Sequence, residues 1–183
     1  MASASASATL AAALLGGVTG CAVLGSTTTA TSGEACADWV TFKSPAEAAS
    51  GAGVVLRGSV VERDGTARFF GVDAHRWLFD VEEVLERPAP ANDVEPRPEV
   101  EVSPGERVAV VSTPETCTAG GLYPGGDPLD PATGLGDADG SVIVLLVDGD
   151  GQGGEGELHL ITPFQGVLTP DLDGSLPAGW LPE

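Results

Sequence analysis

The stretch VVLRGSVVER, residues 54–63, decides the fold. Read with a period of two, alternate residues from Val54 to Val60 fall on one largely apolar face, and Arg57, Ser59 and Arg63 fall on the other. This alternation is typical of a half-buried β-strand. Asp64-Gly65 follows and is a strong signal for a two-residue hairpin turn. Gly58 in mid-strand indicates a bulge or a sharp bend, as where a sheet coils into a barrel.

The composition is that of a small, acidic, loop-rich domain. The chain has 183 residues, of which 26 are Gly and 14 are Pro, and only 5% are aromatic. These numbers favour one domain with turns and short strands over helices. The formal net charge is −19. Such a charge repels nucleic acid and anionic lipid headgroups, and it suits a soluble extracellular domain.

Several further segments have the pattern of strands. His75–Glu86 places Trp77, Phe79 and Val81 on one face, with a phase slip near Glu82-Glu83 that indicates a bulge. A helix is the competing interpretation of this segment, because EEVLE contains good helix formers. Ser141–Val147 is a continuous apolar run, which predicts a central strand covered on both faces. The other expected strands are Thr66–Val72, Val100–Val102, Arg107–Thr113, Leu158–Thr162 and Phe164–Leu168.

The N-terminal residues 1–20 are predicted to be an export signal and not part of the fold. Leu10–Val18 is apolar but too short to span a bilayer, and it ends in Val18-Thr19-Gly20-Cys21. This ending resembles the lipobox of bacterial lipoproteins, which implies that Cys21 is lipidated and becomes the first mature residue. One departure is that no Lys or Arg precedes the apolar run. The alternative is an ordinary secretory signal with an incidental cysteine.

Residues 21–35 read as a flexible tether, and residues 36–183 as a single β-barrel domain. With Cys21 lipidated, Cys36 and Cys117 remain as an even pair in an oxidising compartment. We expect a disulfide between them, and two free buried thiols are the alternative. The bridge closes a loop of about 80 residues, worth roughly 4 to 5 kcal/mol in the chain-entropy model.

One short helix is predicted at the start of the domain. Ser44-Pro45-Ala46-Glu47 is a capping box with Pro at the first helical position, and it opens a helix over Pro45–Ser50. The preceding Trp39, Val40 and Phe42 are interpreted as core or helix-packing residues, with an aromatic ligand platform as the alternative. Trp180 and Leu181 in the tail are expected to dock on the barrel.

The order of these pieces resembles the netrin-module and metalloproteinase-inhibitor type of OB barrel. The pieces that match lie within residues 44–151, namely SPAEAASGAGVVLRGSVVE, WLFDVEEVLE, RVAVVSTPETC and SVIVLLVDGDG. With TPFQGVL and SLPAGWLP in the tail, the chain is also similar to actinobacterial lipoproteins of unknown function. The resemblance implies a mainly β fold: a small antiparallel OB-like β-barrel with one short N-terminal helix and long acidic Gly/Pro-rich loops. Inhibition through an N-terminal cysteine is not carried over, because Cys21 precedes a flexible tether.

The sequence predicts no catalytic residues, no cofactor and no metal. His75, expected at a turn, and His159, expected to face outward on a strand, lie in no recognisable arrangement with a nucleophile. Asp148-Gly149-Asp150 resembles the start of a calcium loop, but His159 stands where the bidentate Glu is expected. The calcium candidates are Asp137, Asp139, Asp148 and Asp150, and solvated turns are the alternative interpretation of these residues.

The predicted function is therefore a non-enzymatic one. We expect a lipid-anchored binding module on the extracellular face of the cell membrane, held there through Cys21 and secreted if the lipobox is not used. The acidic loops 118–140 and 148–157 are the expected binding surfaces, and a cell-envelope protein or a cationic wall component is the expected partner. The alternative is a small extracellular hydrolase or a calcium-dependent module that uses the same loops.

Overall fold

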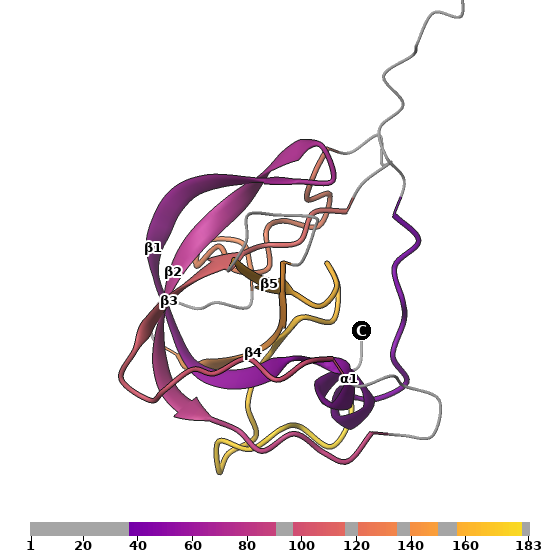
Figure 1. Cartoon of the computed structure of the whole chain (residues 1–183), viewed down its shortest axis with the longest axis vertical. Coiled ribbons are helices and arrows are strands. Elements are labelled where there is room, and N and C mark those ends of the chain that lie inside the picture. Colours follow the sequence, from indigo (N-terminus) through magenta and orange to yellow (C-terminus); the bar gives the residue numbers. More distant parts are fainter. Residues whose placement is uncertain (1–36, 91–96, 116–120, 135–139, 150–156, 181–183) are drawn as a thin grey trace, which may run out of the picture. The chain divides into compact units, whose positions relative to one another are not determined.

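A computed structural model of the chain describes residues 37–90, 97–115, 121–134, 140–149 and 157–180. The chain divides into two units, Met1–Gly33 and Glu34–Glu183, and all of the described residues belong to the second. Its elements, in order along the chain, are α1 (Pro45–Gly51), β1 (Val54–Phe69), β2 (Val72–Val84), β3 (Arg107–Val111), β4 (Val142–Asp148), β5 (Leu158–Leu160) and β6 (Val167–Leu168) (Figure 1).

The strands close into a five-stranded barrel, which confirms the predicted fold class. The order around the barrel is β1-β2-β3-β5-β4, and β4 pairs back onto β1, while β6 extends the edge of β4. All of these pairs are antiparallel except β3 and β5, which run parallel. This mainly β architecture with one short helix is that of a small OB-like barrel.

The first hairpin turn is not where the sequence predicted it. β1 continues through Asp64-Gly65, where two residues oppose Arg76 alone, so this pair forms a bulge. Gly65 has a φ of 88°, the left-handed conformation that such a bulge requires. The chain reverses later, at Phe70-Gly71, where both residues have positive φ as a type I′ turn demands. The predicted strand over 66–72 is accordingly the end of β1, with Val72 starting β2.

The bend predicted at Gly58 is confirmed. The β1–β2 register shifts between Arg57 and Gly58, because Glu82 on β2 has no opposite residue. A Cβ atom at Gly58 would lie 2.0 Å from the Asp80 carbonyl oxygen, so only glycine allows the two strands this close. The segment from His75 is a strand and not a helix. Trp77, Phe79 and Val81 are buried together, as the alternation predicted.

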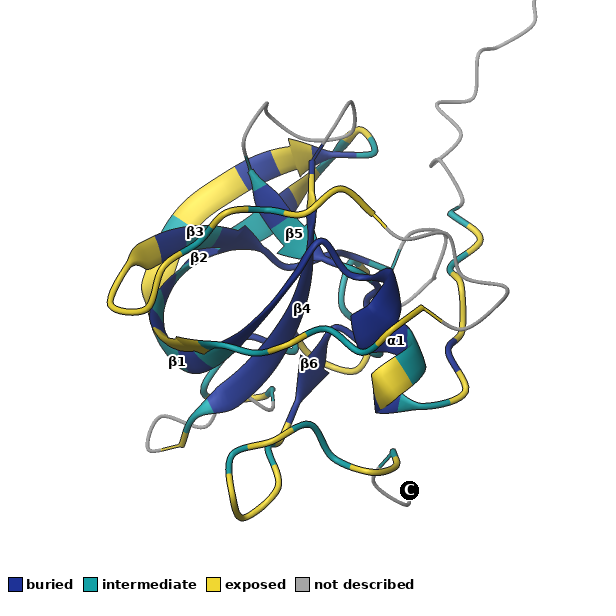
Figure 2. Cartoon of the chain, turned by 60° about the horizontal axis from the view of Figure 1, so that its bottom comes forward, coloured by how far each residue is buried: buried dark blue, intermediate teal, exposed yellow. Residues whose placement is uncertain are grey.

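β4 is the central strand of the domain. Its residues from Val142 to Val147 are all buried, as Figure 2 shows by the dark blue along most of the strand. Val142, Val144 and Leu146 face the barrel interior, where they pack with Phe79. The alternate residues of β4 pack outward against α1 and Leu168. The continuous apolar run thus reflects a strand with one face in the barrel core and the other under the helix.

The helix forms as its capping box predicts, with Ser44 Oγ accepting a hydrogen bond from the Glu47 N–H. Hydrogen bonds from Gln165 and Trp180 hold the segment before the helix, at Phe42, in place. Gln165 accepts from the Phe42 N–H at 2.8 Å and donates to the Phe42 carbonyl at 2.9 Å, and Trp180 Nε1 donates to the same carbonyl. The predicted docking of Trp180 is confirmed, while Leu181 lies outside the described residues.

Three smaller predictions need correction. Val40 is 64% exposed and belongs to no core, although Phe42 is buried as expected. Val100–Val102 is not a strand. Val100 bonds to the Gly53 carbonyl and packs on the barrel core, but Pro98 just before it has no N–H to extend a ladder. Three strands are shorter than predicted, because β3 ends at Val111, β5 ends at Leu160 and β6 begins only at Val167.

Candidate functional site

The most elaborate polar arrangement among the described residues is centred on Asp127. This residue lies in the loop after β3 and is only 4% exposed. Its Oδ2 accepts from His75 Nδ1 at 2.7 Å and from Trp77 Nε1 at 2.9 Å. Its Oδ1 accepts from Ser112 Oγ at 2.6 Å and from the Leu129 N–H at 3.0 Å. A buried carboxyl with four donors is fully satisfied, so the bonds hold the loop onto β2 and the end of β3.

Tyr123 fastens the same loop a second time. Its hydroxyl accepts from the His75 N–H at 3.0 Å and donates to the Ser112 carbonyl at 2.7 Å. Its ring lies 4.6 Å from the imidazole of His75, centroid to centroid. Burial is the main reason that the pKa of Tyr123 rises to about 12. Loop residues 121–134 are thus attached to the barrel through both Asp127 and Tyr123.

The outer side of this loop is hollowed. A hollow of about 350 Å³ lies between the loop and Phe164, and Glu115 lines it with the only acidic side chain among its lining residues. Phe164 is 63% exposed. The other lining residues are mostly small or apolar, with prolines at 124, 128 and 163, and Tyr123 lines the hollow as well. We call this feature the loop hollow.

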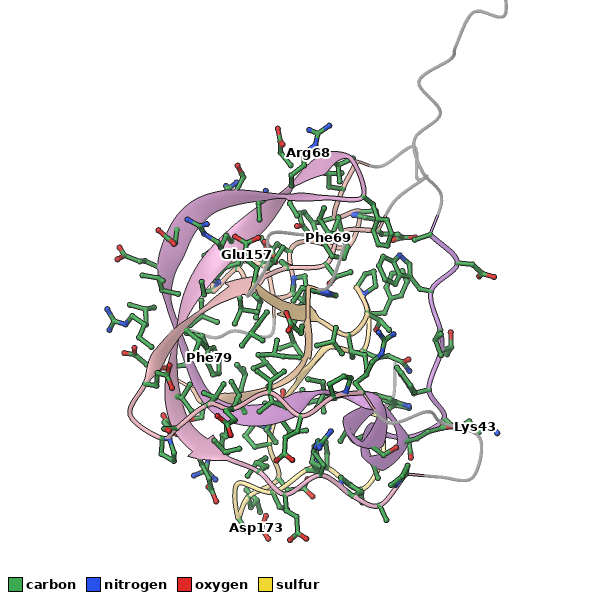
Figure 3. All side chains as sticks on the ribbon, viewed as in Figure 1. Lys43, Arg68, Phe69, Phe79, Glu157 and Asp173 are labelled. Atoms are coloured by element: carbon green, nitrogen blue, oxygen red, sulfur yellow. The ribbon has the colours of Figure 1, made fainter. Side chains whose placement is uncertain are left out.

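A second cavity lies at the tip of the β1–β2 hairpin. Its volume is about 180 Å³, and Trp39, Phe69, Phe70 and His159 form much of its wall. Phe69 and the neighbouring Arg68 mark this end of the domain in Figure 3, while Phe79 lies farther along the barrel. Burial lowers the pKa of His159, whose ring packs 4.8 Å from that of Phe69. We call this feature the aromatic cavity.

His75 differs from expectation in its position, and His159 differs only in its exposure. His75 lies within β2 and not at a turn. His159 lies on the face of β5 opposite Leu158 and Leu160, as predicted, but it is covered by aromatic rings and only partly exposed. Asp127, which lies within the acidic loop 118–140 that we expected to be a binding surface, is buried.

Two residues of the Asp127 cluster are arranged like two of the three members of a catalytic triad. His75 and Asp127 have the relation of the base and its orienting carboxylate. Ser112, however, donates to Asp127 and not to the imidazole, and its side chain is fully buried. It cannot act as the nucleophile of a triad in this geometry. What the cluster does most directly is immobilise a loop.

Most of the site residues predicted from the sequence lie outside the described residues. These are Cys21, Cys36, Cys117, Asp137, Asp139 and Asp150. The lipidation, the disulfide and most of the calcium hypothesis therefore stay predictions. Asp148 is described, is exposed at the end of β4, and lines the aromatic cavity. Within the described ranges, no three His, Cys, Asp or Glu side chains gather into a group that could hold a metal.

The Asp127 cluster was hard to predict from local sequence patterns. Its members come from residues 75–77, 112 and 123–129, and only the fold brings them together. The one available signal was a Trp and a His two positions apart on a strand, facing an irregular loop that contains acids.

Comparison with protein-family models, with curated proteins and with solved structures found no match. In the part of the chain that the structure describes, no helix is long and apolar enough to cross a membrane.

Proposed function

We propose that the chain is a binding module of the cell envelope, lipid-anchored through Cys21 on the extracellular face of the membrane, and that loop 121–134 contacts its partner. The observation that supports this proposal is the burial of Asp127 with four donors. Because the Asp127 carboxyl holds loop 121–134 in place, the loop hollow is pre-organised before a partner binds. Pre-organisation favours binding, because little conformational entropy is lost when a partner docks.

The partner we propose is a cationic envelope protein or wall component. The chain carries 27 acidic residues against 8 basic ones. Five of the basic residues, all arginines, are already engaged in ion pairs within the domain, at positions 57, 68, 76, 87 and 107. Glu115 adds an acid to the loop hollow. A basic group with an apolar stem suits a hollow lined by prolines, two aromatic rings and one carboxylate.

Site-specific photo-crosslinking in the native host tests this proposal. A photoreactive aromatic residue replaces Phe164 at the rim of the loop hollow, and Leu172, which is fully exposed elsewhere, is the matched control position. We expect one discrete crosslinked species from position 164 that disappears in about 0.5 M NaCl, since screening weakens contacts with a cationic partner. The same species from position 172, or none from position 164, contradicts the proposed surface.

The anchor is tested separately by intact mass spectrometry of the membrane fraction. We expect a mature species that begins at Cys21, carries a diacylglyceryl group and gains two hydrogens on reduction of the Cys36–Cys117 bridge. An unlipidated species that retains residues 1–20 contradicts both the anchor and the proposed location.

The alternative function, a small extracellular hydrolase, has one observation in its favour. The His75 side chain is 26% exposed while its Nδ1 is held by Asp127. An oriented imidazole of this kind is able to activate water as a general base. Hydrolysis of an activated ester by the wild type and by His75→Gln tests it. A wild-type rate no higher than that of the variant rejects the alternative.

A further inference from the structure

We propose that the aromatic cavity binds a small uncharged molecule built on a single ring and carrying a hydrogen-bond acceptor. This site is separate from the loop hollow and does not depend on it. The cavity is lined by the rings named above together with Val147, Ile161, Pro98 and the charged pair Arg97 and Asp148.

The size of the cavity indicates one ring. A volume of about 180 Å³ is close to that of an apolar protein cavity of about 150 Å³ that accommodates benzene. The wall rings meet edge to face: Phe69 and Phe70 have centroids 4.7 Å apart at 84°, and Trp39 and Phe70 have centroids 5.8 Å apart at 74°. Walls of this kind offer both ring faces and ring edges to a bound ring.

The acceptor is indicated by a donor that lacks a partner. Trp39 Nε1 is buried and has no hydrogen-bond partner among the described residues. Leaving such a group unsatisfied costs about 1–3 kcal/mol. Trp39 lines the cavity, but this N–H has no accessible surface in the ligand-free chain, so the indole must turn for a ligand oxygen to accept from it and remove the cost.

The charges around the cavity indicate a neutral ligand. Arg97 and Asp148 both line it and carry opposite charges. His159 contributes no positive charge at neutral pH, because burial lowers its pKa. A cation would face Arg97 and an anion would face Asp148, and a neutral ring avoids the cost of moving a charge from water to a site beside aromatic walls.

The hairpin turn gives a fourth, independent indication. Phe70 has a φ of 45°, and it is the only residue other than glycine with positive φ among the described residues. Asn-Gly is the sequence that a type I′ turn prefers, and a bulky aromatic residue at its first position is strained. A strained residue whose ring lines a cavity points to a role for that ring beyond the turn.

The test is an NMR titration of the full ¹⁵N-labelled chain with p-cresol, and with toluene as the ring that lacks an acceptor. We expect p-cresol to shift the Trp39 Nε1–H signal and the amides of Phe69 and His159 saturably, and to bind at least fivefold more tightly than toluene. Benzoate and benzylamine should bind at least tenfold more weakly than p-cresol. Absence of saturable shifts with p-cresol, or equal binding of the charged rings, overturns the proposal.

Two variants test the contributions of the Phe70 ring and of the Trp39 N–H separately. Phe70→Asn creates the preferred turn sequence, so it should keep the thermal midpoint while both ligands bind at least tenfold more weakly. Trp39→Phe should weaken p-cresol at least fivefold and leave toluene unchanged. Trp180→Phe, which lies in a different cluster, is the control and should change neither. Unaltered p-cresol binding in a folded Phe70→Asn variant also overturns the proposal, whatever the crosslinking at Phe164 shows.

Discussion

The Asp127 carboxyl accepts hydrogen bonds from four different residues in the described part of the domain. Its two oxygens serve four donors from β2, the end of β3 and its own loop. Three of these donors, from Trp77, Ser112 and Leu129, belong to buried residues and have no water as a ready alternative. Removing the acceptor therefore costs more than the loss of one hydrogen bond, because several buried donors are left without partners together.

Asp127→Asn should lower the free energy of unfolding by about 2–4 kcal/mol, since the amide presents a second donor where only acceptors are wanted. The matched control is Asp73→Asn, which breaks the exposed ion pair between Asp73 and Arg68. That control should change stability by less than about 0.5 kcal/mol. Urea unfolding of the three proteins measures both values. Equal stabilities for the two variants would mean that Asp127 does not hold the loop.

Tyr123 makes a pH-dependent prediction that a simple absorbance titration can read. It is the only tyrosine of the chain, so tyrosinate absorbance reports on it alone. Its folded-state pKa of about 12 lies above the ordinary value of 10. Its contribution to stability is therefore fully present below pH 10 and is lost as the pH rises toward 12, about 2–3 kcal/mol in all.

We expect Tyr123 to be less than half ionised at pH 11 in the folded chain, and to titrate near pH 10 in 8 M urea. Tyr123→Phe should remove the corresponding loss of stability between pH 10 and 11. A midpoint near 10 in the folded protein would mean that its hydroxyl is exposed and that the loop is not fastened through it.

At the scale of the elements, the long β1–β2 pair carries the bend that lets the sheet close. Three register irregularities divide it, beginning at Arg57/Gly58. Bulges of this kind increase twist and curvature, as closure of a small barrel requires. Gly58 allows β1 and β2 to approach closely, because the backbone of β2 occupies the space that a side chain at Gly58 would need.

Gly58→Ala should destabilise the domain by more than about 2 kcal/mol, because its Cβ would meet the Asp80 carbonyl oxygen and the Phe79 ring. Gly179→Ala is the matched control, since a Cβ there meets nothing within 4 Å. Thermal unfolding of the two variants measures the difference. Similar midpoints for both would show that the strands can separate at Gly58 without cost.

The elements also show how far local sequence determines this fold. Alternation was sufficient to predict β1 and β2, and the continuous apolar run was sufficient to predict β4, because burial of one face or of both faces follows from their residues. The hairpin turn predicted at Asp64-Gly65 was wrong, because a left-handed glycine occurs in bulges as well as in turns. Only the pairing of these two residues opposite Arg76 shows that they form a bulge. The Asp127 cluster was not predictable, because its partners are up to 52 residues apart in sequence.

On the scale of the whole molecule, excess negative charge is the dominant electrostatic feature. The net charge of −19 is what remains after the 8 basic residues are counted against the 27 acidic ones, so the ion pairs of the arginines do not reduce it further. Folding brings these acids closer together than they are in the unfolded chain. Self-repulsion therefore opposes the compact state, and salt reduces it by screening.

We expect the free energy of urea unfolding at pH 7 to increase on the order of 1 kcal/mol between about 20 mM and 500 mM NaCl. The same measurement decides the calcium hypothesis for Asp137, Asp139, Asp148 and Asp150. If these acids contribute only to the overall negative charge of the protein, 1 mM CaCl₂ and 1 mM MgCl₂ in 150 mM NaCl should stabilise the chain equally. A larger effect of calcium, abolished by Asp148→Asn, would instead identify a calcium site, because a bound ion stabilises only the folded state that holds it.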